Sequence, residues 1–297
     1  MFDGFETHRI ATSGTEINLR LGGEGRPVLL LHGYPQTHLC WHKVAPVLAK
    51  RYCVVVPDLR GYGDSGCPPS DDDHMAYSKR TMAQDMAEVM TALGHETFAV
   101  IGHDRGSRVA YRLTLDHPER VTHLGSLDVV TTLDMWEAVN KDRAIGGFHW
   151  SFLAQPAPFP EQLIAGDPEY FATFLMRKWA ADDFEFDAEA MAEYIRCFSK
   201  PDVIRATCED YRAGATVDPE IDRTDRDAGQ RITCPMLFLW GGLRGFGGVD
   251  IDDPLDVWRA WADDVTGGPL PTGHFLPEEA PDEVAARITA FLGAGNS

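Results

Sequence analysis

The segment Gly-His-Asp-Arg-Gly at residues 102–106 constrains the fold of this chain more than any other feature of the sequence. It follows an apolar run at 97–101 and precedes a helix-like stretch at 107–117. This strand–turn–helix pattern is typical of a nucleophile elbow, where flanking glycines let neighbouring backbone pass close to the turn. The plainer alternative makes Asp104 a helix N-cap and the glycines part of an ordinary turn. The strand directly before the turn favours the elbow.

Other apolar runs place this bend in a parallel sheet. Buried strands are predicted at 28–31, 53–56, 97–101, 121–127 and 235–240. Continuous apolar strands that alternate with helical patterns indicate an α/β protein with a mostly parallel central sheet flanked by helices. Strand signals stop and aromatic residues increase between 131 and 216. We therefore expect a helical cap at 131–216, inserted into a core formed by 1–130 and 217–297.

Charge and hydropathy exclude several classes of protein. Acidic residues outnumber basic ones by 46 to 27, which gives a formal net charge of −19. Such a charge repels phosphate backbones and anionic membranes, so we expect no nucleic-acid and no membrane partner. No apolar run approaches the ~20 residues that span a bilayer, and the N-terminus lacks a signal-peptide pattern. A cytoplasmic protein is the resulting expectation.

The sequence gives no sign of a metal or cofactor site. Its six cysteines are scattered without a C-x-x-C pair, which favours free thiols. His38 and His42 have i, i+4 spacing, but no third ligand accompanies them, so a zinc site is not expected. We predict a protein that uses neither a metal nor a cofactor.

A carboxylate at the elbow determines the chemistry. An aspartate needs no deprotonation and can attack an sp³ carbon that carries a leaving group, which gives an ester on Asp104. Hydrolysis of that ester needs a base, and His274, on a loop before the terminal helix, has the late chain position that this triad order requires. A carboxylate should orient the imidazole. Asp128, at the end of the strand 121–127, is our first choice and Asp250 the weaker alternative.

Two backbone N–H groups and two arginines are expected beside the nucleophile. The N–H of Tyr34, in the loop after the strand 28–31, is placed to face the N–H of Arg105 and to hold an oxyanion with it. Arg105 and Arg108 are three residues apart at a helix start, so their side chains can share one face beside Asp104. Their planar guanidinium groups suit a carboxylate. Surface pairing with acidic neighbours is the alternative for either one.

Five segments together resemble one family. They read HGYPQTH at 32–38, GHDRGSRV at 102–109, HWSFLAQP at 149–156, CEDYRAG at 208–214 and GHFLPEE at 273–279. Over nearly its whole length the chain resembles bacterial haloacid dehalogenases of the α/β-hydrolase fold, in particular fluoroacetate dehalogenases. It departs from their pattern mainly at 242–248, in a loop of unusual composition.

The resemblance implies a role for each candidate residue. Asp104 would be the nucleophile, His274 the base and Asp128 its acid. Arg105 and Arg108 would bind the substrate carboxylate. The departing halide would be bound by His149, Trp150 and Tyr211, and Trp179 would line the pocket. The resemblance also implies a homodimer and a small anionic haloacid as substrate, with a haloacetate such as fluoroacetate converted to the 2-hydroxy acid and halide. Single aromatic residues of this kind are otherwise more often core packing.

Two rival functions stay open. An epoxide hydrolase uses the same aspartate and histidine chemistry, and it needs cap tyrosines, for which Tyr170, Tyr194 and Tyr211 are available. An arginine pair beside the nucleophile suits a neutral epoxide poorly. The second rival is a catalytically silent receptor for small acids, which would have no need to retain Asp104, Asp128 and His274 together.

Overall fold

The computed structural model of the chain describes residues 1–243 and 253–294. Within these ranges a single eight-stranded sheet has the spatial order β1-β2-β4-β3-β5-β6-β7-β8. Its strands are β1 (Glu6–Ala11), β2 (Glu16–Gly22), β3 (Arg26–Leu31), β4 (Tyr52–Pro57), β5 (Phe98–His103), β6 (Val121–Leu127), β7 (Met236–Gly241) and β8 (Val265–Leu270). The pairings of β1 with β2 and of β2 with β4 are antiparallel, and all pairings from β4 to β8 are parallel. The predicted architecture is confirmed.

Helices cover both faces of the sheet. Outside the segment between β6 and β7 they are α1 (Ala45–Leu48), α2 (Lys79–Ala92), α3 (Arg105–Asp116), α12 (Pro254–Trp261), α13 (Leu276–Glu279) and α14 (Pro281–Gly293), with short 3₁₀ turns η1 (His38–Trp41) and η2 (Met75–Tyr77). Successive side chains of a strand point to opposite faces. Leu29 and Leu31 of β3 accordingly pack in the core with α2, α3 and α12, whereas Val28 and Leu30 pack in a second core with α1 and α14. A strand that is buried on both sides must be apolar throughout, which explains the continuous runs in the sequence.

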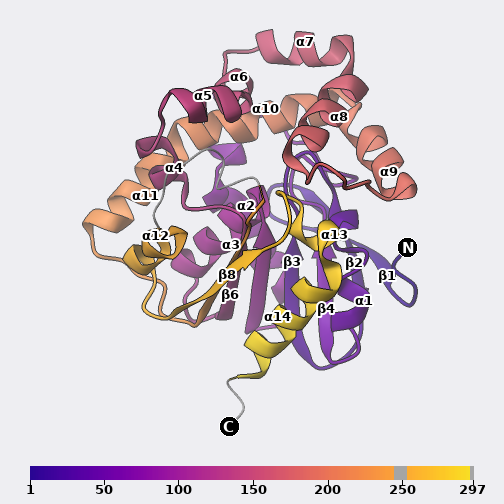
Figure 1. Cartoon of the computed structure of the whole chain (residues 1–297), viewed down its shortest axis with the longest axis vertical. Coiled ribbons are helices and arrows are strands. Elements are labelled where there is room, and N and C mark those ends of the chain that lie inside the picture. Colours follow the sequence, from indigo (N-terminus) through magenta and orange to yellow (C-terminus); the bar gives the residue numbers. More distant parts are fainter. Residues whose placement is uncertain (244–252, 295–297) are drawn as a thin grey trace.

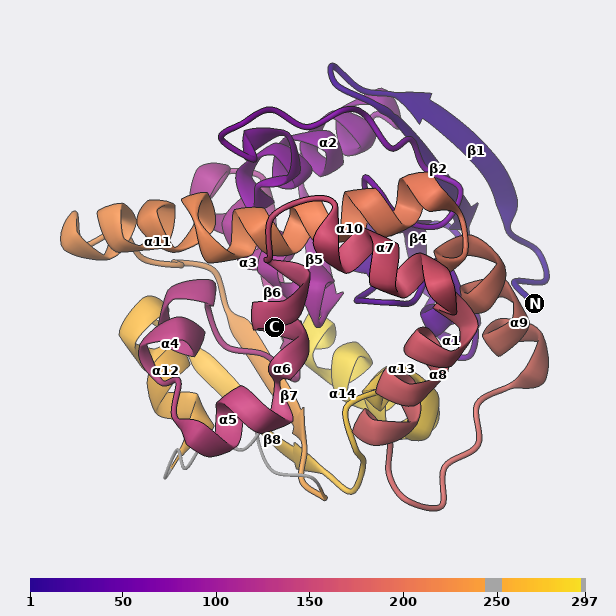
Figure 2. The same cartoon turned by 90° about the horizontal axis from the view of Figure 1, so that it is seen from above.

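A long helical segment separates β6 from β7. It comprises α4 (Thr132–Glu137), α5 (Lys141–Gly146), α6 (Phe148–Leu153), α7 (Phe159–Gly166), α8 (Pro168–Trp179), α9 (Ala188–Phe198), α10 (Pro201–Ala215) and α11 (Val217–Asp227). Figure 1 shows α5 to α10 as a layer over one end of the sheet, and in the view from above α6 and α10 lie in the region of β5 and β6, whereas α8 lies near α13 (Figure 2). The helices continue past residue 216 as α11. No helix in the described part of the chain is both long and apolar enough to cross a bilayer.

Candidate active site

Asp104 lies at a sharp bend between β5 and α3. Its backbone has φ +49° and ψ −117°, a conformation that non-glycine residues rarely adopt and that marks functional turns. A Cβ at Gly102 would lie 2.4 Å from the Gly106 carbonyl oxygen, and a Cβ at Gly106 would lie 2.4 Å from the carbonyl oxygen of His32. Both glycines are therefore required by close backbone approach, as expected for an elbow.

One oxygen of the Asp104 carboxylate is anchored by the loop that follows β3. The Tyr34 N–H donates a hydrogen bond of 2.8 Å to Oδ1 of Asp104. The approach is close because residue 33 is glycine: a Cβ there would lie 2.4 Å from the Cβ of Asp104. The contact brings the Tyr34 N–H to the carboxylate that would carry the oxyanion, and its role as an oxyanion donor stays a prediction. The matching contribution of the Arg105 N–H stays a prediction.

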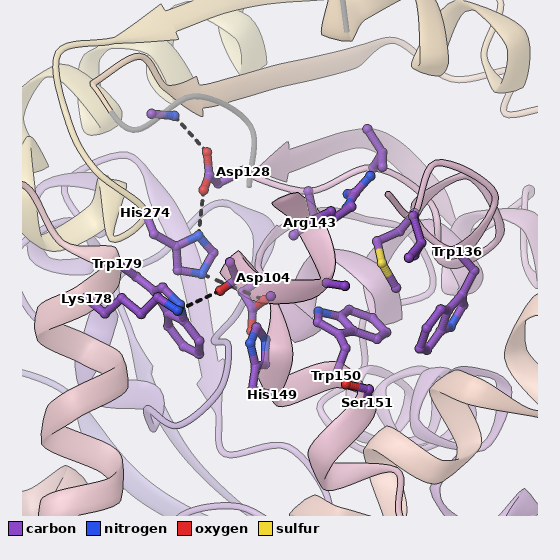
Figure 3. Close-up of a pocket in the computed structure, with 18 of the residues that line it drawn as sticks. Asp104, Asp128, Trp136, Arg143, His149, Trp150, Ser151, Lys178, Trp179 and His274 are labelled. Carbon is purple, nitrogen blue, oxygen red and sulfur yellow. Dashed lines mark hydrogen bonds and ion pairs between the residues drawn. The ribbon is translucent and has the colours of Figure 1, made fainter. Parts of the chain in front are cut away.

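The histidine and the acid proposed from the sequence meet at the same place. His274 lies between β8 and α13, and its Nδ1 is 2.5 Å from Oδ2 of Asp128, which follows β6 directly. The Gly241 N–H donates to the other oxygen of Asp128 at 2.7 Å. The Nε2 atom of His274 faces Oδ2 of Asp104 at 3.8 Å, too far for a good hydrogen bond (Figure 3). The alternative acid, Asp250, lies outside the described residues, as does most of the unusual loop at 242–248.

Burial and neighbouring charges shift the pKa values of Asp104 and His274 in opposite directions. Burial alone would raise the pKa of Asp104, but the facing His274, His103 and the Arg105 guanidinium hold it below its usual value. Burial would likewise lower the pKa of His274, yet its hydrogen bond to Asp128 and the charges of Asp128 and Asp104 raise it. At neutral pH Asp104 is therefore an anion, and the raised pKa of His274 favours the protonated imidazole while Asp104 carries its charge.

Asp104 opens into a cavity of about 310 Å³ beneath the helical layer. His274 and Asp128 form its wall on the sheet side, and His149, Trp150 and Trp179 enter it from α6 and α8 (Figure 3). The rest of the lining is largely apolar and includes Val129, Val130, Met135 and Trp136. Enclosed pockets with a few convergent polar groups are the usual form of small-molecule sites.

The three residues suggested for halide binding form one cluster. The ring of Tyr211, on α10, lies 5.7 Å from that of His149 and 5.3 Å from that of Trp150. In the described part of the chain, Nδ1 of His149 is buried without a hydrogen-bond partner. Burial, opposed in part by Asp104, lowers the pKa of His149 to about 3. The imidazole is therefore neutral at physiological pH and offers one N–H, beside an indole and a phenol.

The comparison with known proteins decides the family. Residues 26–242 match the family model described as alpha/beta hydrolase fold. The chain belongs to the α/β-hydrolase family. This hydrolase is 41% identical to a fluoroacetate dehalogenase from a Burkholderia species, an alignment that covers 100% of this chain and 97% of the relative. It is 33% identical to a soluble epoxide hydrolase from Corynebacterium sp. strain C12, with 96% of each chain covered. A solved structure from Nostoc sp PCC 7120, described as an alpha/beta hydrolase, has a TM-score of 0.95 at 53% identity and covers 99% of both chains.

The two arginines predicted from the elbow of this hydrolase have different surroundings. Arg108 lines the cavity, where its guanidinium lies 4.6 Å from the Trp150 ring and 3.3 Å from the hydroxyl of Thr132. Arg105 is not among the residues that line the cavity. Its Nε and Nη2 atoms each donate 2.8 Å hydrogen bonds to the carboxylate of Asp210. Of the Arg105 nitrogens only Nη1 is without a partner in the described structure, so its predicted role in carboxylate binding depends on that atom and stays a prediction.

Two functional candidates in the helical layer of the hydrolase were not found from the sequence. Asp210 is fully buried and accepts hydrogen bonds from Arg105, Lys79 and Tyr62. Arg143, on α5, lines the cavity with Nη1 unpartnered. Asp210 lies in one of the family segments, but its partners are distant in sequence. Arg143 had no motif to mark it.

Proposed function

We propose that this α/β hydrolase removes halide from small 2-haloacids, such as a haloacetate, and releases the 2-hydroxy acid. The observation that carries the proposal is the arrangement around Asp104: an ionised carboxylate with one oxygen anchored and the other turned toward His274, beside a cavity that contains the Arg108 guanidinium. A small anionic substrate would balance that buried cation.

In the first step Oδ2 of Asp104 attacks the carbon opposite the halogen. The new C–O bond forms as the carbon–halogen bond breaks, and the halide leaves with the bonding electron pair. In this proposal the N–H and O–H donors that stabilise the developing negative charge come from His149 and Trp150, which line the cavity, and from Tyr211, which is not in the lining but packs its ring against theirs. Arg108 holds the carboxylate of the substrate, with Nη1 of Arg105 as the second predicted contact.

In the second step water hydrolyses the ester on Asp104. Nε2 of His274 accepts a proton from the water, and Asp128 stabilises the imidazolium that forms. Oδ1 of Asp104 has become the ester carbonyl oxygen and carries the negative charge of the tetrahedral intermediate. The Tyr34 N–H, already 2.8 Å away, stabilises it there, with the Arg105 N–H as the proposed second donor. The intermediate then collapses as the Cγ–Oδ2 bond breaks, and Oδ2 leaves as the hydroxyl oxygen of the product with the proton from His274.

The helices at residues 131–216 act in this proposal as a cap that excludes water. They supply His149, Trp150 and Trp179 to the cavity, whereas the core supplies Asp104, Asp128 and His274. Exclusion of solvent strengthens the electrostatic contacts inside the cavity and limits access to the ester.

Epoxide hydrolysis is the second candidate, because a relative at 33% identity is a soluble epoxide hydrolase. That reaction needs phenolic groups that protonate the opening oxygen. Of the three tyrosines considered from the sequence, Tyr170 is 66% exposed on α8, and the hydroxyl of Tyr194 is 3.2 Å from Glu278. Tyr211 alone has its ring against His149 and Trp150. Tyr170 is exposed and the Tyr194 hydroxyl bonds to Glu278, so neither is a good proton donor for an epoxide, and we therefore favour a haloacid substrate.

Turnover of chloroacetate and of styrene oxide by the same preparation tests the proposal. Ion chromatography should detect chloride and glycolate in equal amounts, and the Asp104→Ala variant should release neither. Diol formation from the epoxide without chloride release would reverse the assignment. Binding of chloroacetate without turnover of either substrate would instead support the hypothesis of a catalytically silent receptor for small acids.

A further inference from the structure

The buried arginines of the described chain fall into two groups. Four of them pair with carboxylates through ion pairs of 2.5 to 2.8 Å: Arg60 with Asp85, Arg105 with Asp210, Arg112 with Asp225, and Arg212 with Glu209. The remaining two, Arg108 and Arg143, have no carboxylate partner within the described residues, and both line the cavity. In a chain with 46 acidic and 27 basic residues, two unpaired buried cations in one cavity need an explanation.

Arg143 is a buried residue that lines the cavity, not a surface residue. It is 8% exposed, on the short helix α5, and its Nη1 atom has no hydrogen-bond partner in the described structure. Burial and the nearby charge of Arg108 lower its pKa to about 10, so it stays a cation at neutral pH. Neither arginine forms an ion pair within the described residues, although the charge of Asp104 acts on Arg108. An anion that binds beside both guanidinium groups would reduce their mutual repulsion.

The cavity also exceeds the size of a haloacetate. Its volume of about 310 Å³ corresponds to roughly ten water molecules at ~30 Å³ each, whereas a haloacetate has only two carbon atoms. In Figure 3 Arg143 lies across the cavity from Trp179, on the side of Trp136. Val129, Val130 and Met135 line the same cavity and can accommodate a short carbon chain.

We propose that the cavity has a second anion subsite at Arg143, and that its preferred substrates are 2-halo acids with a second carboxylate on a short carbon chain. The inference rests on the proposed function and extends it. Arg108 holds the carboxylate next to the reacting carbon, and Arg143 holds the distal one. The chemistry is unchanged: Oδ2 of Asp104 bonds to the carbon as the halide leaves with its electron pair, and water then restores Asp104 and releases a hydroxy-dicarboxylate.

A matched series of 2-bromo acids separates charge from size. Bromosuccinate, 2-bromoglutarate and 2-bromoadipate are each compared with the 2-bromo monocarboxylate of the same chain length, and bromoacetate is the reference. Bromide and the hydroxy acid are both quantified, so that elimination is not counted as hydrolysis. For at least one chain length, kcat/KM for the dicarboxylate should exceed that for the monocarboxylate by about tenfold or more, the size of effect that a charge-assisted contact provides.

Substitutions at two positions of α5 test the subsite itself. Arg143→Met should abolish the preference for the dicarboxylate, and Arg143→Lys should restore part of it. Lys141→Met removes a charge from the same helix at a side chain that is 83% exposed, and should leave the preference intact. Melting temperatures of all variants show whether each one is folded.

The outcomes distinguish the two proposals. Bromide release from bromoacetate with no dicarboxylate preference at any chain length overturns the subsite but leaves the dehalogenase. A preference that survives in Arg143→Met also overturns the subsite. Absence of bromide release from every compound, in a folded protein, overturns the proposed function itself.

Discussion

The two carboxylate oxygens of Asp104 have different surroundings, and in the proposed mechanism this difference determines which oxygen attacks the substrate. Oδ1 accepts a hydrogen bond from the Tyr34 N–H at 2.8 Å, whereas Oδ2 faces Nε2 of His274 at 3.8 Å. In the proposed mechanism the anchored oxygen becomes the oxyanion, and the other oxygen attacks the substrate carbon. The distance between Oδ2 and His274 also leaves the imidazole available for a water instead of a tight ion pair with Asp104.

The ester on Asp104 should accumulate when the base is removed. The first step needs only a carboxylate, so His274→Ala should still alkylate Asp104, but hydrolysis should slow by about 10² to 10⁴-fold, the usual contribution of a positioned general base. Mass spectrometry after incubation with chloroacetate should find the added carboxymethyl group on the peptide that contains Asp104. An Asp104→Ala, His274→Ala double variant should lack it. Full turnover by the single variant would remove His274 from the mechanism.

The pKa of His274 should report the charge of Asp104. Burial alone would lower this pKa, but Asp128 and Asp104 raise it above its usual 6.5. Asp104→Asn removes one raising charge, so an NMR titration should find a lower pKa for His274 in that variant than in the wild type. Ester formation removes the same charge, and neutral imidazole is the active base. The rate of ester hydrolysis should therefore rise with pH through a midpoint below the His274 pKa of the free enzyme. An unchanged or higher pKa in Asp104→Asn would contradict this electrostatic picture.

At the scale of elements, the bend between β5 and α3 depends on close contact with β3. A Cβ at Gly106 would lie 2.4 and 2.5 Å from the carbonyl oxygens of His32 and Leu31, which are backbone atoms that cannot rotate away. Gly106→Ala should therefore lower the free energy of unfolding by about 1–3 kcal/mol or more, and it should reduce activity by moving Asp104. Chemical denaturation and halide release measure the two effects.

A glycine in open space provides the control for that substitution. Gly166 is the last residue of α7, and a Cβ there would have no atom within 4 Å. Gly166→Ala should change the free energy of unfolding by no more than about 0.5 kcal/mol. Equal effects at the two glycines would mean that the elbow tolerates a side chain and is not sterically constrained.

The same elements show which parts of the fold are predictable from sequence. Strands β3 to β7 are covered by helices on both faces, so their apolar runs stand out. β1 alternates exposed and half-buried residues at the sheet edge, and β8 reads Val-Thr-Gly-Gly-Pro-Leu. Glycine and proline carry no strand signal. β8 forms because β7 offers it a parallel partner, from Met236 to Gly241, and that pairing is a tertiary effect.

At the scale of the whole molecule, the candidate site also contains some residues that the sequence identifies and others that it does not. Asp104, Asp128 and His274 were predictable because each follows a recognisable strand or has a fixed place in the chain order of the fold. Arg143 and Asp210 acquire their surroundings only when the helical layer lies over the sheet. Local sequence around either residue does not contain that information.

Asp210 joins the helical layer to the core through buried charge. Its carboxylate, on α10, accepts hydrogen bonds from Arg105 at the start of α3, from Lys79 at the start of α2, and from the hydroxyl of Tyr62. Burial would raise its pKa, but the two cations hold that pKa well below its usual value. Asp210→Asn keeps the shape of the side chain and leaves both cations without their main counter-ion.

Loss of this carboxylate should therefore destabilise the whole protein. Removal of one partner from a buried ion pair typically costs about 3–5 kcal/mol, because the remaining charge is left uncompensated. We expect Asp210→Asn to lower the denaturation midpoint accordingly, and to impair turnover because Arg105 directly follows Asp104. Glu220→Gln breaks the exposed pair with Arg223, so it should cost less than about 1 kcal/mol. If the two variants unfold at the same denaturant concentration, the buried cluster does not hold the helical layer on the core, and the packing of α10 must do so instead.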